Sequence, residues 1–199
     1  MKRIILASGS PRRQELLKLI GINFEVRVSS WTEIEQKVVA QCPVPLLDPR
    51  ELCCYNATEK AKSITLSPEE DCIVIGCDTI VVVDKYILGK PSSKEDAKDM
   101  LSRLSGKTHT VCSGLSVIDN KSQKKITRCV ETSVQFRDLS SLEIEWYVET
   151  GEPLDKAGSY GIQGRGALLI EKIDGCYYNV VGLPLVTLYS ILIELGLWG

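Results

Sequence analysis

The sequence has little histidine and no excess of either charge. His109 is its only histidine, and no Gly-x-Ser-x-Gly segment accompanies it, so a Ser-His-Asp hydrolase would lack its usual frame. We interpret His109 as a strand residue with a satisfied ring. The chain has 24 Lys and Arg residues and 26 Asp and Glu residues, which gives a net charge of −2. Attachment to nucleic acid or to an anionic membrane surface needs a basic excess, so we expect neither partner and only a local anion site.

No apolar run is long enough to cross a bilayer or to direct secretion. The stretches at 72–83 and 183–197 are interrupted by Asp78 and Glu194, whereas a membrane span needs ~20 clean residues. The apolar run near the N-terminus has four residues, too few for the central region of a secretory signal. We therefore expect a cytoplasmic protein without a membrane span.

Disulfide and zinc patterns are missing, although the chain contains 8 Cys. The cysteines are diluted over 199 residues without a secretory signal, which argues against a disulfide framework. Cys53 and Cys54 are adjacent, and no Cys-x-x-Cys pair or neighbouring histidine completes a zinc set. We interpret the cysteines as free thiols that serve as small buried hydrophobes.

The rest of the composition is ordinary for a globular protein, with 44% apolar and 25% charged residues. A chain of this length can bury a core without disulfides or metals. Apolar periodicity alternates between the spacing of strands and that of helices. Strands are predicted over 3–6, 24–28, 72–83, 86–88, 108–118 and 126–136, and helices over 11–20, 48–64, 94–104, 142–149 and 184–195.

Two features of this order define the expected fold. The strands at 108–118 and 126–136 flank a polar tip and predict an antiparallel pair, so the sheet of this α/β protein is mixed. A glycine-rich loop region covers 151–166. Because we find no repeat, low-complexity tract or linker, residues 1–199 are expected to form one domain, built of two lobes.

A candidate anion site lies at residues 8–13, Ser-Gly-Ser-Pro-Arg-Arg, between a predicted strand and the start of a predicted helix. Free backbone amides and the helix dipole at such a turn favour an anion, and two arginines add bidentate phosphate donors. The same residues also fit a plain helix start with two solvated arginines.

Asp78 is the strongest single candidate for a functional residue. It interrupts the apolar run at 72–83, where a carboxylate is costly unless a metal, a cation or hydrogen bonds compensate it. The alternative places Asp78 at a strand end facing water. Asp84 fits that second role better, because Asp84-Lys85 resembles a hairpin tip.

Other charged residues carry weaker signals, and two tempting motifs fail. Lys90 follows a rigid Gly-Lys-Pro turn, whereas Lys60 on a predicted helix and Glu33 in a polar loop also fit ordinary solvated positions. Residues 105–108 resemble the end of a P-loop, but Leu101 stands where its first glycine is required. The glycines of 161–166 are spaced wrongly for a dinucleotide fingerprint.

Taken together, several segments resemble the Maf family of nucleoside triphosphate pyrophosphatases in order and spacing. They are residues 8–13 (SGSPRR), 76–79 (GCDT), 89–91 (GKP), 105–109 (SGKTH), 151–164 (GEPLDKAGSYGIQG) and 181–185 (VGLPL). The resemblance implies an elongated α/β fold, shared with inosine triphosphate pyrophosphatases, in which helices flank a mixed β-sheet and a central cleft separates two lobes. It also implies that a nucleoside triphosphate and water give the monophosphate and pyrophosphate, with a divalent cation (Mg²⁺, Mn²⁺ or Co²⁺). Relatives are often dimers, so we expect a homodimer.

The resemblance assigns expected roles residue by residue. Asp78 matches the proposed general base, and Glu33 matches an acidic loop residue that helps Asp78 to hold the metal. The remaining matches contact phosphate or the substrate: Lys60 and Lys90 as catalytic cations, and Ser8, Ser10, Arg12, Arg13, Thr79 and Gln163 in substrate binding. One departure stands before Glu33, where the loop reads Ser-Trp-Thr and relatives often carry another acidic residue.

Substrate choice follows from three of these positions. The subfamily resembling dTTP and UTP pyrophosphatases carries Arg, Thr and Gln there, as Arg12, Thr79 and Gln163 do here, and the subfamily acting on 7-methyl-GTP differs at all three. We therefore expect hydrolysis of dTTP and UTP, with CTP and modified pyrimidine nucleotides as further candidates. The alternatives are a 7-methyl-GTP pyrophosphatase and a nucleotide-binding regulator of cell division or septum formation.

Overall fold

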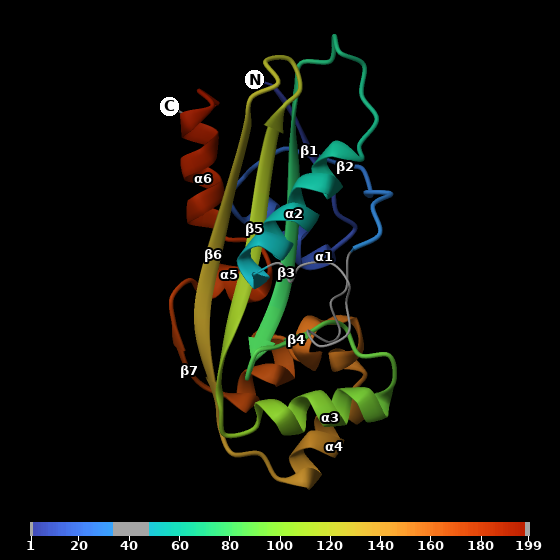
Figure 1. Cartoon of the computed structure of the whole chain (residues 1–199), viewed down its shortest axis with the longest axis vertical. Helices are drawn as coiled ribbons and strands as arrows, with labels where there is room; N and C mark the ends of the chain where they lie inside the picture. Colours follow the sequence, from blue (N-terminus) through green and yellow to red (C-terminus); the bar gives the residue numbers. More distant parts are fainter. Residues whose placement is uncertain (1, 34–47, 198–199) are drawn as a thin grey trace.

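A computed structural model describes residues 2–33 and 48–197, and within them one mixed sheet forms the centre of the molecule (Figure 1). The strands follow the order β2-β1-β3-β5-β6-β7, and β4 pairs with β3. Their bounds are β1 Arg3–Leu6, β2 Glu25–Val26, β3 Cys72–Val83, β4 Tyr86–Leu88, β5 Thr108–Asp119, β6 Lys125–Phe136 and β7 Ile170–Asp174.

Helices flank this sheet, so the predicted α/β class is confirmed. They are α1 Pro11–Leu19, α2 Pro49–Lys62, α3 Lys94–Leu104, α4 Ser141–Glu149, α5 Tyr177–Val181 and α6 Leu185–Glu194, and three short 3₁₀ turns cover Glu152–Asp155, Ala157–Ser159 and Gly164–Leu169. In the described part of the chain, no helix combines the length and apolar character that a membrane crossing requires.

The sheet is mixed because its first strands run parallel and the others do not. β1 pairs in parallel with β2 and β3, whereas the β3–β5, β5–β6 and β6–β7 pairs are antiparallel. The predicted antiparallel pair at 108–118 and 126–136 is confirmed as β5 and β6. Together with β3 these long strands run along the molecule and make it elongated (Figure 1).

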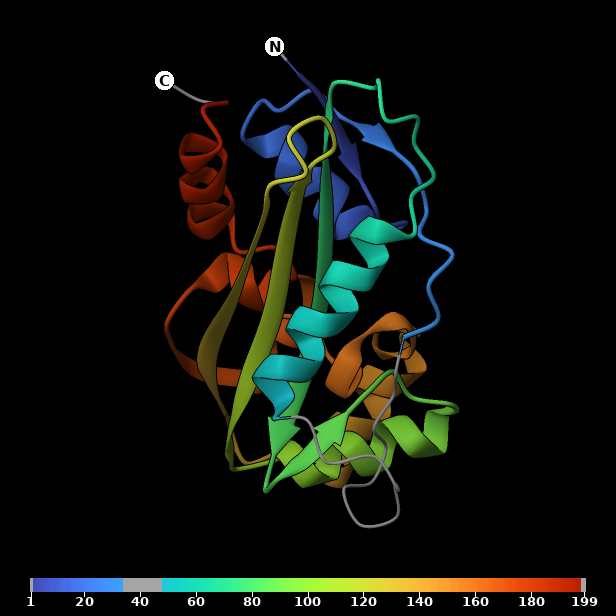
Figure 2. The same ribbon diagram turned by 45° about the horizontal axis from the view of Figure 1, so that its top comes forward.

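Two separate apolar cores occupy the two ends of the long strands and define the two lobes. One core packs residues of β1, β3 and β5 against α1 and α6, and it includes Leu17, Ile75 and Leu188. The other packs the far ends of β3 and β5 against α3 and α4, and it includes Leu101 and Tyr147. Figure 2 shows the red helix α6 and the green helix α3 at opposite ends of these strands.

Helix α2 packs unusually close to one face of the sheet. A side chain at Gly76 would place its Cβ 2.1 Å from the carbonyl oxygen of Ala57, and one at Gly114 would lie 2.2 Å from that of Cys53. Both glycines are therefore required by the contact with the α2 backbone. Because alternate strand residues share a face, Asp78 projects from β3 on the same side as Gly76, toward α2.

Three sequence predictions need correction. The strand expected over 24–28 is reduced to Glu25–Val26, because its neighbour β1 ends at Leu6 and the pairing stops there. β7 and α5 were not predicted. Both are short: β7 is held by its pairing with β6, and α5 by the packing of its buried residues. The loop region at 151–166 contains two of the 3₁₀ turns given above and the start of the third, which continues to Leu169.

The thiol and histidine interpretations can also be tested. Every cysteine in the described part of the chain is a free thiol, and Cys42 lies outside it. The His109 Nε2 lies 2.7 Å from the Tyr160 hydroxyl, as expected of a satisfied ring, but its Nδ1 is buried without a hydrogen-bond partner. Burial lowers the pKa of His109 to about 4, so its ring is neutral near pH 7.

Candidate active site

A cleft of about 440 Å³ opens beside the middle of β3. β1 pairs with β3 only as far as Ile75, and β4 begins to pair on the same edge at Val81. Among the described residues no strand covers the edge of β3 between those two positions. Residues of β3 that point to opposite faces, such as Asp78 and Thr79, therefore both reach the cleft. All ten site residues expected from the sequence line it: Ser8, Ser10, Arg12, Arg13, Glu33, Lys60, Asp78, Thr79, Lys90 and Gln163.

Asp78 lies at the floor of this cleft and is only 4% exposed. Its Oδ1 accepts a hydrogen bond from the Lys60 ammonium at 2.7 Å, and its Oδ2 accepts one from the Asn56 amide at 3.1 Å. A buried carboxylate needs such partners to offset its desolvation. The alternative of a strand end facing water is therefore wrong.

Lys60 links two carboxylates that come from different parts of the chain. Its ammonium lies 2.5 Å from Glu33 Oε1 and 2.7 Å from Asp78 Oδ1, and the residue is 7% exposed. The alternative of an ordinary solvated helix face is wrong for this lysine. One ammonium thus balances two acidic groups at the cleft floor.

Glu33 belongs to the loop after β2, and its carboxylate is half-exposed at 41%. Burial acts to raise the pKa of Glu33, but the charge and hydrogen bond of Lys60 oppose it. The positive charges of Lys90 and Arg13 act in the same direction as Lys60, and the pKa of Glu33 lies below its ordinary value. Glu33 is therefore an anion near pH 7, in a field of cations.

Arg13 joins the turn at residues 8–13 to the wall of the cleft. Its Nε donates to the Gly182 carbonyl at 2.9 Å, Nη1 to Ser8 Oγ at 3.1 Å and Nη2 to Thr79 Oγ1 at 3.3 Å. Arg13 is 9% exposed, so the alternative of two solvated arginines fails for this residue. Ser10 stands at the N-cap of α1 without a capping side-chain bond, so the amides that follow Pro11 have no side-chain cap, and their residues Arg12 and Arg13 line the cleft.

The mouth of the cleft carries the more exposed candidates. Arg12 Nη1 pairs with Asp155 Oδ2 at 2.9 Å, across the opening between α1 and the first 3₁₀ turn. Lys90 and Gln163 are exposed there, and both line the cleft. These side chains can change partners at small cost, because exposed ion pairs contribute little to stability.

Sequence reasoning missed Asn56 and Trp31. Asn56 is 1% exposed, and Trp31 Nε1 donates to its Oδ1 at 3.3 Å, so Trp31 orients the amide that holds Asp78. A signal was available, since asparagine is a poor helix former and stands four residues before Lys60, on the same helical face. Trp31 carried no such signal, because it comes from the loop before Glu33.

Cys77, next to Asp78, takes no part in this chemistry. Its side chain points to the opposite face of β3 and donates to the Gly182 carbonyl at 3.4 Å. Burial raises the pKa of the Cys77 thiol, which keeps it protonated and unreactive.

The donor atoms at the cleft floor suit a hard divalent cation. Glu33 and Asp78 present carboxylate oxygens that are near enough to share one ammonium, and oxygen is the ligand that Mg²⁺ and Mn²⁺ prefer. Among the described residues around the cleft, Glu33 and Asp78 are the two carboxylates that pair with the Lys60 ammonium. The departure noted before Glu33, Ser30-Trp31-Thr32, supplies no carboxylate, and its Trp31 side chain donates to Asn56 instead.

Comparison with known proteins decides the family. A family model described as Maf-like protein matches residues 3–195. The chain belongs to the Maf family. This Maf protein is 50% identical to a protein of Clostridium botulinum (strain Kyoto / Type A2) that is named dTTP/UTP pyrophosphatase, over 98% of both chains.

More distant organisms contain relatives of the same name. This Maf protein is 48% identical to the dTTP/UTP pyrophosphatase of Dictyoglomus thermophilum, over 98% of this chain and 97% of the relative. It is 46% identical to that of Methanococcoides burtonii, over 99% of this chain and 97% of the relative. The family resemblance expected from the motifs is confirmed, and each of these relatives is matched over nearly its whole length.

Proposed function

We propose that this Maf protein hydrolyses dTTP and UTP to the monophosphate and pyrophosphate. The observation that carries the proposal is the buried Asp78 carboxylate, held by Lys60 and Asn56 at the floor of a cleft that also collects Arg12, Arg13 and Lys90. A carboxylate base beside several cations fits a reaction in which water loses a proton and the leaving pyrophosphate gains negative charge. The names of the relatives support the same reaction and substrates.

In the proposed reaction the oxygen of a water molecule attacks the α-phosphorus. The bond between this phosphorus and the oxygen that bridges to the β-phosphorus breaks, and its electron pair leaves with pyrophosphate. Asp78 accepts the proton of the water, since its carboxylate is fixed by Lys60 and Asn56 and cannot rotate freely. The protein supplies position and charge and forms no covalent intermediate.

A divalent cation, Mg²⁺, Mn²⁺ or Co²⁺, would be held by Glu33 and Asp78. When bound, it supplies positive charge that offsets the triphosphate and favours ionisation of water. Lys60 keeps the two carboxylates together and prevents their mutual repulsion from opening the floor of the cleft.

The charge that develops on the leaving pyrophosphate has its own partners. The turn at residues 8–13 offers helix amides together with Ser8 and Ser10, and Arg13 adds a guanidinium already oriented by Gly182 and Thr79. Lys90 reaches the same cleft from the turn after β4. These groups are placed to bind the polyphosphate, with Lys60 and Lys90 as the catalytic cations.

Base choice is proposed to depend on Arg12, Thr79 and Gln163. All three line the cleft, and Thr79 is fixed by Arg13 and by Ser113, whose hydroxyl lies 2.8 Å away. The Gln163 amide offers a donor and an acceptor to the edge of a pyrimidine. CTP and modified pyrimidine nucleotides present similar edges and are proposed as additional substrates.

The decisive experiment measures pyrophosphate release from dTTP, UTP, CTP, 7-methyl-GTP, GTP, ATP and ITP with Mg²⁺ or Mn²⁺. We expect release from dTTP and UTP, and a loss of at least ~1000-fold in kcat for Asp78→Asn with nucleotide binding retained. Asp84→Asn is the matched control, because Asp84 is exposed at the hairpin tip and pairs with Lys107.

Two results would contradict the proposal. Activity confined to 7-methyl-GTP would overturn the assignment of Arg12, Thr79 and Gln163. Tight nucleotide binding without release of pyrophosphate from any substrate would instead indicate the regulatory role in cell division.

A further inference from the structure

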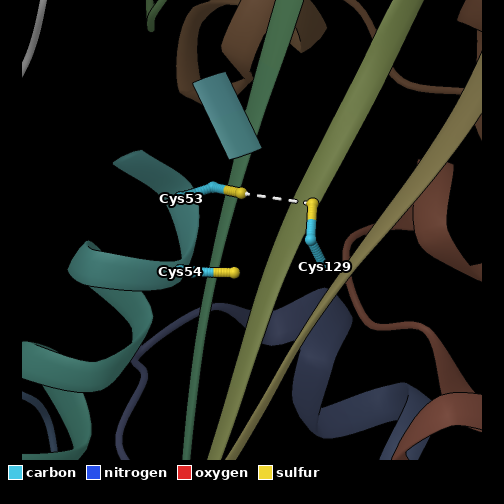
Figure 3. Close-up of side chains that lie close together, drawn as sticks. All are labelled: Cys53, Cys54 and Cys129. Carbon is cyan, nitrogen blue, oxygen red and sulfur yellow. Dashed lines mark hydrogen bonds between the residues drawn. The ribbon is translucent and has the colours of Figure 1, made fainter. Parts of the chain in front are cut away.

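Three cysteine thiols from two distant parts of the chain converge outside the active-site cleft. Cys53 and Cys54 lie in the first half of α2, and Cys129 lies on β6. Figure 3 shows the Cys53 and Cys54 sulfurs pointing from the helix toward the strand that carries Cys129. The three sulfur atoms all lie within 4.8 Å of one another. The sequence shows no zinc pattern here because the third thiol is 75 residues or more away along the chain.

The fold holds this group in place through the close packing of α2. Cys129 pairs in register with Gly114 of β5, and the Cys53 carbonyl lies where a side chain of Gly114 would project. The absence of that side chain lets the start of α2 settle over β5 and reach β6. The position of the three thiols is therefore fixed by backbone contacts rather than by flexible loops.

The surroundings of the thiols contain one ion pair and leave the group accessible to solvent. Arg50, in the first turn of α2, pairs with Glu131 at 2.6 Å, and Glu131 stands two residues after Cys129 on the same face of β6. Cys53 is fully buried, whereas Cys54 and Cys129 are partly exposed. Because the Arg50–Glu131 pair carries no net charge, the negative charge of the thiolates would be offset by the bound cation itself. The partly exposed sulfurs leave a path to solvent.

The spacing of the thiols is close to that of thiolates on one metal ion. Two thiolates bound to one tetrahedral ion with metal–sulfur bonds of about 2.3 Å lie about 3.8 Å apart. The Cys53 and Cys129 sulfurs, which form a thiol–thiol hydrogen bond, also lie 3.8 Å apart. Three converging thiols, rather than two, also exceed what a disulfide would use.

We propose that Cys53, Cys54 and Cys129 bind one thiolate-preferring divalent cation of the zinc class, with the fourth position open toward solvent. This site is separate from the Glu33 and Asp78 oxygen donors and takes a softer ion. Because α2 also carries Asn56 and Lys60, the cation would fasten the helix of the active site to β6. The proposal does not depend on the substrate of the cleft.

The test titrates reduced, metal-free full-length protein with Zn²⁺ against a chromogenic chelator, and with Co²⁺ to record a thiolate-to-metal charge-transfer band. We expect one Zn²⁺ bound per chain, a charge-transfer band with Co²⁺ and a higher midpoint of thermal unfolding with Zn²⁺. Cys54→Ser and Cys129→Ser should each weaken Zn²⁺ binding by at least roughly tenfold and remove most of the band. Cys176→Ser is the matched control, since Cys176 is another partly buried free thiol and does not belong to the group of three.

Three outcomes would overturn the proposal. A Co²⁺ spectrum without the charge-transfer band would place any bound ion on oxygen ligands. Equal Zn²⁺ affinity in Cys129→Ser and Cys176→Ser would show that Cys129 is not a ligand. The third outcome is a disulfide. It would be revealed if wild-type protein unfolded without reductant had two fewer alkylated thiols than the same protein after reduction. Far-UV circular dichroism of each variant verifies that it is folded. If Cys54→Ser on α2 does not fold, the test rests on Cys129→Ser alone.

Discussion

Lys60 is the residue on which the proposed chemistry depends most. It is almost fully buried, and its ammonium touches both carboxylates of the cleft floor. Removal of one member of a buried charge network leaves the others uncompensated, which costs far more than loss of a surface pair. Lys60 therefore helps to keep the pKa of Glu33 below its ordinary value and adds to the positive charge presented to the triphosphate.

We predict that Lys60→Met lowers kcat/KM by at least ~100-fold, and that Lys60→Arg recovers part of the loss. Without Lys60 the burial of Glu33 is less opposed, so the pKa of Glu33 rises. A carboxylate with a raised pKa becomes protonated at higher pH, and the acid limb of the pH profile of kcat/KM should shift upward. Lys62→Met is the control, because Lys62 is exposed on the same helix and pairs only with Glu59 in the described contacts. An unshifted acid limb in Lys60→Met would contradict the role of Lys60.

At the scale of elements, α2 brings together the two sites. It begins at a capped turn, where Arg50 N donates to the Asp48 carboxylate at 2.8 Å, and it presents Asn56 and Lys60 to β3. Helix propensity alone does not position it. The position comes from Gly76 and Gly114, whose missing side chains let the helix backbone approach the sheet.

We predict that Gly114→Ala lowers the free energy of unfolding by about 1–3 kcal/mol, the typical cost of overpacking. The new Cβ would lie 2.2 Å from the Cys53 carbonyl, which is backbone and cannot move without shifting α2. Urea denaturation monitored by circular dichroism measures the loss. Gly89→Ala is the control, because a Cβ there meets nothing within 4 Å. Equal stability of the two variants would show that α2 does not depend on close packing.

At the scale of the whole molecule, the same long strands build both lobes. β3 contributes Ile73 and Ile75 to one core and Val81 and Val83 to the other. β5 likewise supplies Leu115 to the first core and Val111 to the second. A lobe cannot unfold without removing one end of strands that the other lobe needs. We propose on this ground that the chain acts as a single domain; the homodimer and the cytoplasmic location stay predictions.

We predict one cooperative unfolding transition. Far-UV and near-UV circular dichroism should give the same melting midpoint, and the calorimetric and van't Hoff enthalpies should agree. Two resolved transitions would show that the lobes fold independently, in spite of the shared strands. The measurement should be made at several protein concentrations, because a dimer makes the midpoint depend on concentration.

Most elements were predictable from the sequence, including the short strands β1 and β4, whereas the extent of β2 and the elements β7 and α5 were not. β3 and α3 match their expected bounds, because a continuous apolar run and a well-spaced apolar face encode them locally. β2 is shorter than predicted and β7 was missed, since a strand of a few residues exists only where a neighbour pairs with it. The expected site residues were found through motif order, whereas Asn56 and Trp31 had no motif.

The sequence alone determined the class of the fold through its apolar periodicity. Its motifs identified the family by resemblance and, through that resemblance, ten of the residues that line the cleft. Only the tertiary structure decided that Lys60 is buried between Asp78 and Glu33, that Arg13 is tied to Gly182 and Thr79, and that three thiols converge behind α2. The physical reason is that burial and pairing belong to contacts between distant segments, which arise when α2 packs on the sheet.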